Sequence, residues 1–312
     1  MSEKSKWLNW IIFIGLSFVW GSSFILMKLG LYAADGSVVL SATQVAALRI
    51  FSGGAVLLPF FISSVRKIPK DKWGIIILSG LLGSFIPAFL FCIAETRIDS
   101  ALAGTLNSLT PSFVIITGIL LFKTKTSAQK IIGVLISLAG CFMLLFTKET
   151  KASDNNWYAG FILIATVMYG ANVNMVKQKL NNVGSLNIAT FAFVVLTIPS
   201  LIILFLSGYF SLPLSQYEYL RATGASALLG IGGTAVASIL FYVLVKRAGA
   251  LFGSMVTYGI PFVAILWGIL YGENIGWLEI ISLAIILTGV FIVNKNFKPP
   301  LSPSPSGPDA SR

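Results

Sequence analysis

Several polar and aromatic side chains stand inside long apolar stretches of the sequence. In one such stretch, Asn107 and Pro111 are four residues apart and therefore share a helix face. In a second, similar stretch, Tyr258 and Pro261 occupy the corresponding place. A buried amide or phenol needs a hydrogen-bonding partner, so we expect Asn107 and Tyr258 to contact a solute in a cavity. A helix-helix hydrogen bond for Asn107 and plain packing for Tyr258 are the alternatives. The two prolines are candidate gating points.

A second set of candidates consists of Trp20, Ser23, Tyr169 and Asn172. Trp20 and Tyr169 stand 149 residues apart and each precedes a glycine, which permits close approach of a neighbouring helix. Ser23 and Asn172 follow three residues later in each case and add hydrogen-bonding groups. We expect all four to line a substrate-binding cavity, with buried packing as the alternative for Trp20.

Ionisable groups are rare within the apolar stretches. Glu95 ends one of them and is a candidate for proton coupling or for binding a substrate amine, with a solvated helix end as the alternative. Arg49 lies about two turns inside another, where a structural ion pair is favoured over anion recognition. The chain has no histidine, which excludes a Ser-His-Asp triad and a histidine metal site. We therefore expect no enzymatic activity, no cofactor and no metal.

These residues require long apolar elements to hold them. Hydrophobic residues make up 56% of the 312 residues and charged residues only 11%, far below the share in soluble domains. No segment alternates apolar and polar residues, so the spans are expected to be helices. The fold class predicted is an all-α integral membrane protein with ten transmembrane helices, over residues 8–29, 42–64, 73–94, 100–122, 128–147, 157–178, 187–208, 222–245, 250–271 and 276–294.

The net charge of +11 is explained by membrane topology. With the N-terminus in the cytoplasm, 16 of the 22 Lys and Arg residues fall on the cytoplasmic side and five on the other, while Arg49 lies in a span. This asymmetry predicts cytoplasmic N- and C-termini and no nucleic-acid partner. Cys92 and Cys141 lie in apolar spans, where each is expected to act as a small hydrophobic residue.

The sequence repeats itself after 149 residues. Gly83 aligns with Gly232 and Arg97 with Lys246, besides the Trp20 and Tyr169 pair. Five spans is an odd number, so the second copy enters the membrane from the opposite side, as a 5+5 inverted-topology repeat around a central cavity. The domains expected are residues 1–150 and 151–298, one five-helix repeat each, followed by a disordered tail or expression remnant at 299–312.

Three segments carry a family resemblance: WGSSF at 20–24, AETRIDSALAGTLNSLTPSF at 94–113 and VTYGIPFVAILWGILYGE at 256–273. They resemble the drug/metabolite transporter superfamily, specifically its EamA-type exporters, over about residues 8–296. The resemblance implies a basket of ten helices in which helices one, three, four, six, eight and nine surround a central cavity. It also implies export or facilitated diffusion of small metabolites such as amino acids.

The function predicted is secondary transport of small metabolites, with export of amino acids or related compounds, by alternating access. The alternative is a flippase or passive facilitator for an amphiphilic or lipid-linked intermediate on the same scaffold. The expected partners are a small-molecule substrate, the lipid bilayer and a proton as candidate coupling ion, and a monomer would suffice. The expected location is the cytoplasmic (inner) membrane, as a multi-pass protein.

Overall fold

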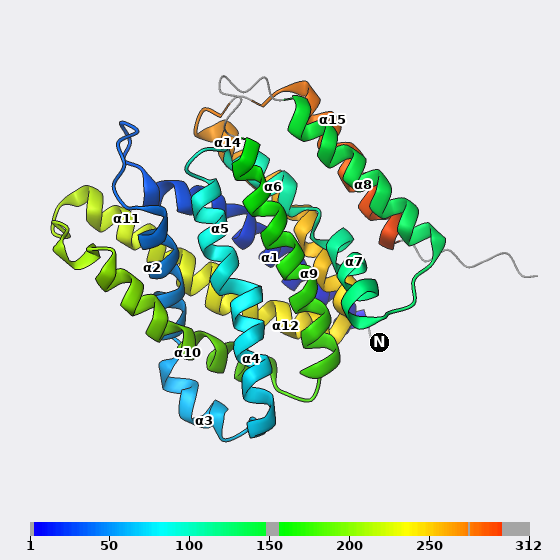
Figure 1. The fold of residues 1–312 in the computed structure, drawn as a ribbon, viewed down its shortest axis with the longest axis horizontal. Helices are drawn as coiled ribbons and strands as arrows, with labels where there is room; N and C mark the ends of the chain where they lie inside the picture. The colour runs from blue at the N-terminus through cyan, green and yellow to red at the C-terminus, as the bar shows by residue number, and fades with distance from the viewer. Residues whose placement is uncertain (1–2, 148–155, 274, 295–312) are drawn as a thin grey trace, which may run out of the picture.

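The computed structural model describes residues 3–147, 156–273 and 275–294, and within these ranges the chain folds into helices without a β-sheet (Figure 1). The predicted tail at 299–312 lies outside the described residues. The helices are α1 Glu3–Leu31, α2 Ala42–Ala55, α3 Phe61–Val65, α4 Trp73–Gly80, α5 Ile86–Ala94, α6 Ser100–Asn107, α7 Thr110–Phe122, α8 Ala128–Thr147, α9 Asn156–Lys179, α10 Ser185–Leu206, α11 Tyr217–Leu228, α12 Ala237–Ala248, α13 Ala250–Ser254, α14 Gly259–Leu270 and α15 Trp277–Asn294.

The apolar helices confirm an all-α membrane protein. In the described part of the chain, eight helical stretches are long and apolar enough to cross a bilayer. Helix α2 and the helical residues 58–65 form a ninth span if they are counted together. A short break before Pro59 separates them, and the two parts are bent by 43° relative to each other. At the place of the tenth predicted span, α15 is apolar over the shorter stretch Trp277–Val293.

The third and eighth spans each contain a π-helical turn near the middle. Residues Leu81–Phe85 join α4 to α5, and residues Leu229–Val236 join α11 to α12. The two turns contain Gly83 and Gly232, which correspond in the 149-residue repeat. A π turn widens the helix locally and often occurs at functional sites. The sequence repeat is therefore matched by a repeat of the same backbone irregularity.

The fourth and ninth spans are both interrupted before a proline. In the fourth, α6 ends at Asn107 and α7 begins at Thr110, with Pro111 in its first turn. A proline inside a helix clashes with the carbonyl four residues earlier, here that of Asn107. That carbonyl accepts a 2.7 Å hydrogen bond from Thr110 Oγ1 instead. In the ninth span, a 3₁₀ turn at Met255–Tyr258 separates α13 from α14, which contains Pro261.

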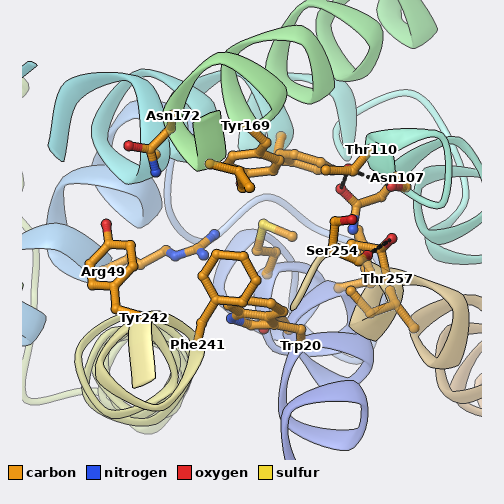
Figure 2. Close-up of a pocket in the computed structure, with 17 residues that line it drawn as sticks. Trp20, Arg49, Asn107, Thr110, Tyr169, Asn172, Phe241, Tyr242, Ser254 and Thr257 are labelled. Carbon is orange, nitrogen blue, oxygen red and sulfur yellow. Dashed lines mark hydrogen bonds between the residues drawn. The ribbon is translucent and has the colours of Figure 1, made fainter. Parts of the chain in front are cut away.

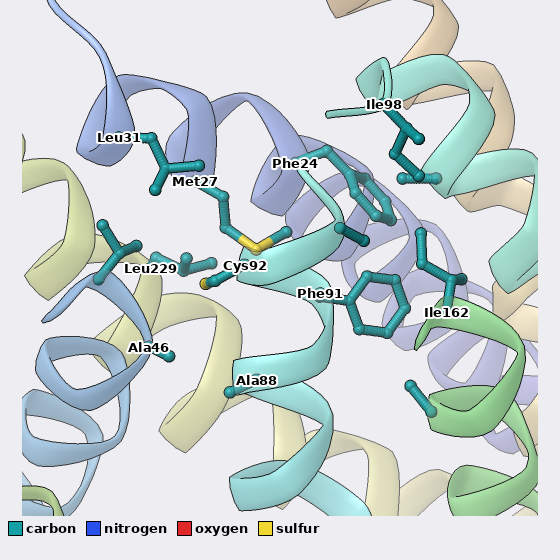
Figure 3. Close-up of a cluster of buried hydrophobic side chains, with 14 of the residues drawn as sticks. Phe24, Met27, Leu31, Ala46, Ala88, Phe91, Cys92, Ile98, Ile162 and Leu229 are labelled. Atoms are coloured by element: carbon teal, nitrogen blue, oxygen red, sulfur yellow. The ribbon is translucent and has the colours of Figure 1, made fainter. Parts of the chain in front are cut away.

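The helices pack in pairs that fit two related halves. Helix α1 packs on α14, and its counterpart α9 packs on α7. Helices α8 and α15 lie side by side at one edge of the molecule, whereas α2 and α10 pack together away from that edge (Figure 1). A buried cluster fills the space between α1, α2, α5, α6 and α9; it includes Phe24, Ala46, Phe91, Ile98 and Ile162 (Figure 3).

Candidate functional site: a central cavity with one arginine

A cavity of about 740 Å³, part of it open to solvent, lies between the two halves of the chain (Figure 2). Helices of both halves contribute to its wall. The lining residues are Trp20, Ser23, Phe24, Met27, Arg49, Gly83, Phe91, Asn107, Thr110, Tyr169, Asn172, Val173, Phe241, Tyr242, Ser254, Thr257 and Ile260. The structure thus brings together five of the predicted substrate-binding residues, namely Trp20, Ser23, Asn107, Tyr169 and Asn172.

Two aromatic pairs face each other across this cavity. Trp20 lies against Phe241 with ring centroids 5.2 Å apart, and Tyr169 is stacked on Phe91 with centroids 6.1 Å apart. Each pair joins one helix of one half to one helix of the other. Trp20 Nε1 donates a 2.9 Å hydrogen bond to the carbonyl of Gly233 in the second π turn. This bond satisfies the N–H donor of the indole and fixes the orientation of its ring. Apolar ring surface is therefore available to a solute.

Neutral polar groups gather at one end of the cavity, where the two interrupted spans meet (Figure 2). Asn107 and Thr110 come from α6 and α7, and Ser254 and Thr257 come from α13 and the 3₁₀ turn. Thr257 Oγ1 donates to the Ser254 carbonyl over 2.7 Å. The helix breaks before Pro111 and Pro261 thus place amide and hydroxyl groups at the cavity surface. Both prolines are themselves buried.

Arg49 lies at the opposite side of the cavity and points its guanidinium group into it (Figure 2). It is 9% exposed, and its Nε donates a 2.8 Å hydrogen bond to Thr234 Oγ1 in the second π turn. We expected Arg49 to form a structural ion pair, but no carboxylate among the described residues pairs with it. The sequence signal that could have corrected this expectation is the absence of any carboxylate from the apolar stretches around it.

Ser23 and Asn172 line the cavity but also bond within the protein. Ser79 Oγ donates to Asn172 Oδ1 over 2.6 Å, which links α4 to α9. Ser23 Oγ donates to the Val19 carbonyl, one turn earlier in α1. A methyl group on Gly83 would overlap the Asn172 side-chain amide, which would have to move away to make room. The close approach of Asn172 to Gly83 brings α9 against the π turn of the third span.

Tyr258 and Glu95 lie outside the cavity lining. The Tyr258 hydroxyl donates a 2.9 Å hydrogen bond to the Val290 carbonyl and so holds α15 against the 3₁₀ turn of the ninth span. Glu95 is fully buried at the end of α5, where its Oε2 lies 3.9 Å from Lys28 Nζ. Tyr258 therefore joins two elements of the fold, and Glu95 belongs to a charged cluster separate from the cavity.

The charged cluster joins three elements at one end of the bundle. Ser100 Oγ donates to Glu95 Oε2 over 3.3 Å, and Glu95 Oε1 is buried without a hydrogen-bond partner. Burial raises the pKa of Glu95, just beyond the span Lys70–Ala94, to about 8, although Lys28 opposes the shift. Glu273, which follows α14, accepts hydrogen bonds from the backbone N–H groups of Ser100 and Ala101. The first turn of α6 is thereby held by the second half of the chain.

Comparison with known proteins agrees with this architecture. The EamA-like transporter family matches residues 7–146 and again residues 156–295. An uncharacterized transporter of Archaeoglobus fulgidus is 24% identical over 91% of this chain and 98% of its own length. The uncharacterized inner membrane transporter YedA of Escherichia coli K12 is 25% identical over 89% of this chain and 88% of its own.

More distant similarity extends to plants and to a solved structure. A chloroplastic WAT1-related protein of Arabidopsis thaliana is 23% identical over 93% of this chain and 70% of its own length. A crystal structure that is 19% identical shares the fold over 91% of this chain and 95% of its own, with a TM-score of 0.62. The two family matches together cover most of the described residues. The chain therefore belongs to the EamA-like transporter family, within the drug/metabolite transporter superfamily, and is a multi-pass membrane transporter.

Proposed function

We propose that this protein is a secondary transporter that exports small metabolites, with amino acids or related compounds as its cargo, by alternating access. The observation that carries the proposal is the cavity between the two halves, which is partly open to solvent and lined by aromatic rings, amides, hydroxyls and one arginine. Such a lining can bind a small solute through polar groups at its ends and ring surfaces at its sides. It needs no covalent step, so no enzymatic reaction is proposed.

Contacts between the halves occur at both ends of the bundle and are candidates for the two gates. At one end, Glu273 accepts hydrogen bonds from the backbone N–H groups of Ser100 and Ala101 at the start of α6. At the other, Arg247 Nε donates to Asn9 Oδ1 over 3.1 Å. Breaking one set while keeping the other would open the cavity to one side only. The interrupted spans at Pro111 and Pro261 supply backbone that can flex in this exchange.

The remaining features of the proposal concern location and coupling. The uneven distribution of Lys and Arg between the two sides supports cytoplasmic N- and C-termini, and the likeness to an inner membrane transporter supports the cytoplasmic membrane. Glu95 is the proposed proton carrier, because its carboxyl is buried with one oxygen unpartnered. One chain supplies every residue of the cavity, so a monomer suffices.

The test is solute flux in proteoliposomes against a panel of amino acids and related metabolites, with and without a pH gradient. We expect saturable counterflow of at least one class of compound. Asn107→Trp should block it by filling the cavity, whereas Leu120→Trp should not, because Leu120 is 71% exposed at the surface of α7. Flux that fails to saturate, or that survives Asn107→Trp, would contradict a carrier that works through this cavity.

A further inference from the structure

The cavity holds a positive charge that the described residues leave without a counter-ion. Arg49 Nε donates a hydrogen bond to Thr234 Oγ1. No carboxylate in the described part of the chain forms an ion pair with Arg49. Its terminal nitrogens face the cavity (Figure 2). Burial removes water from this charged guanidinium group, which costs free energy unless an opposite charge compensates it. The site is therefore electrostatically incomplete until an anion enters it.

The two carboxylates of the charged cluster make their contacts away from Arg49. Glu95 faces Lys28 and Ser100, and Glu273 accepts from the backbone of Ser100 and Ala101. The cavity lining itself includes no Asp or Glu. A solute ammonium group would thus find no carboxylate in this cavity, only neutral hydrogen-bond acceptors and the faces of aromatic rings.

The shape of the lining indicates what the rest of the anion would be. The ring pairs Trp20 with Phe241 and Tyr169 with Phe91 lie on opposite sides of the space next to Arg49 (Figure 2). Planar apolar groups fit between such walls. The amide and hydroxyl groups of Asn107 and Thr257 lie beyond them, across the cavity from the arginine (Figure 2).

We propose that the cavity selects organic anions: a carboxylate bound by the terminal nitrogens of Arg49, with an apolar or aromatic body between Trp20 and Tyr169. This inference rests on the proposed transport function and, among the amino acids and related compounds named there, favours carboxylic acids that lack an ammonium group. A simple carboxylic acid should bind more tightly than the matching amino acid, because the α-ammonium group adds a second positive charge near Arg49. A neutral amide should bind more weakly again, and an amine most weakly.

The experiment compares four ligands that share a phenyl ring on a two-carbon chain, by calorimetric titration of the full-length protein in detergent micelles. The ligands are 3-phenylpropanoate, phenylalanine, 3-phenylpropanamide and 2-phenylethylamine. We expect 3-phenylpropanoate to bind about tenfold or more tightly than 3-phenylpropanamide, the range for a hydrogen bond to a charged group. Equal affinities for the acid and the amide, or no binding of the acid at millimolar concentration, would overturn the inference.

Three variants locate the preference at Arg49. Arg49→Gln should reduce affinity for the acid about tenfold or more and abolish its preference over the amide, and Arg49→Lys should keep part of it. Arg66→Gln is the matched control, because Arg66 is exposed beside α3. A preference that survives Arg49→Gln would also overturn the inference. Should Arg49→Gln not fold, the acid and amide affinities of the unmodified protein still decide.

The two proposals fail in different ways. Saturable counterflow of amides or amines, with no preference for acids, would leave the transporter proposal standing and remove only the anion-selective site. Tight, Arg49-dependent binding of the acid without counterflow of any compound would remove the transporter proposal and leave the binding site.

Discussion

Glu273 Oε1 accepts a 2.9 Å hydrogen bond from the backbone N–H of Ser100, and its second oxygen accepts one of 3.1 Å from Ala101. The two N–H groups belong to the first turn of α6, which has no intrahelical acceptors for them. A carboxylate at this position also interacts favourably with the helix dipole. The end of the ninth span thus caps the fourth span, and the two spans belong to different halves of the repeat.

Removing this cap should weaken closure of the bundle at this end. We expect Glu273→Ala to lower the free energy of unfolding by about 1–2 kcal/mol, as for loss of other helix caps. It should also increase maleimide labelling of a cysteine placed at Thr105, one turn into α6, in a background without Cys92 and Cys141. Asp71→Asn, which changes an exposed carboxylate elsewhere, is the control. Unchanged labelling in Glu273→Ala would show that the contact stabilises the fold without closing a gate.

The second π turn, Leu229–Val236, offers a matched pair of glycines, Gly230 and Gly232. A methyl group on Gly230 would overlap Ser52 Oγ and the Arg49 carbonyl, where α2 crosses the turn, whereas at Gly232 it would meet open space. Gly230→Ala should therefore lower the free energy of unfolding by several kcal/mol if the backbone cannot shift, and the thermal midpoint should fall clearly with it. Gly232→Ala should leave it nearly unchanged. Equal midpoints for the two variants would mean that α2 is free to move away from the turn.

The sequence predicts the spans well because hydropathy over about 20 residues does not depend on how a helix is rotated. The repeat is readable for a related reason, since glycines such as Gly83 and Gly232 mark the same backbone position in both halves. Which side chains enter the cavity does depend on rotation. Thr257, four residues before Pro261 as Asn107 is before Pro111, lines the cavity with Asn107, while the neighbouring Tyr258 turns toward Val290.

The position of Arg49 illustrates a second limit. Its repeat counterpart is Ile198, so comparison of the two halves gives no hint of its role. Its distance from the carboxylates follows from the packing of α2 on the second π turn, which hydropathy does not encode. A single arginine inside an apolar span is a sign of function, but only the three-dimensional arrangement tells an ion pair from a binding site.

Glu95 should make stability depend on pH. Its pKa, about 8 against an ordinary value of 4.5, means that the folded protein binds a proton that the unfolded chain releases. This contribution is fully present below pH 4.5 and is lost as the pH rises through about 8. Lys28 favours the ionised form, whereas Glu273 and Asp99 oppose it. We expect the thermal midpoint to fall between pH 5 and pH 8, and Glu95→Gln to flatten that dependence. An equal slope in Glu95→Gln would assign it to other groups.

Asn107 and Tyr258 should differ in what their substitution affects. Asn107→Ala removes an amide from the cavity wall, so we expect a loss of solute affinity of about fivefold, equivalent to one neutral hydrogen bond, with normal membrane insertion.

Tyr258→Phe removes the hydroxyl that bonds the Val290 carbonyl. It should lower the unfolding free energy by about 1 kcal/mol and leave affinity unchanged. Titration and thermal unfolding of both variants separate the two effects, because a residue that contacts the solute changes the first measurement and a packing residue only the second. Weakened binding in Tyr258→Phe, with unfolding unaffected, would return Tyr258 to the solute path and contradict the position found here.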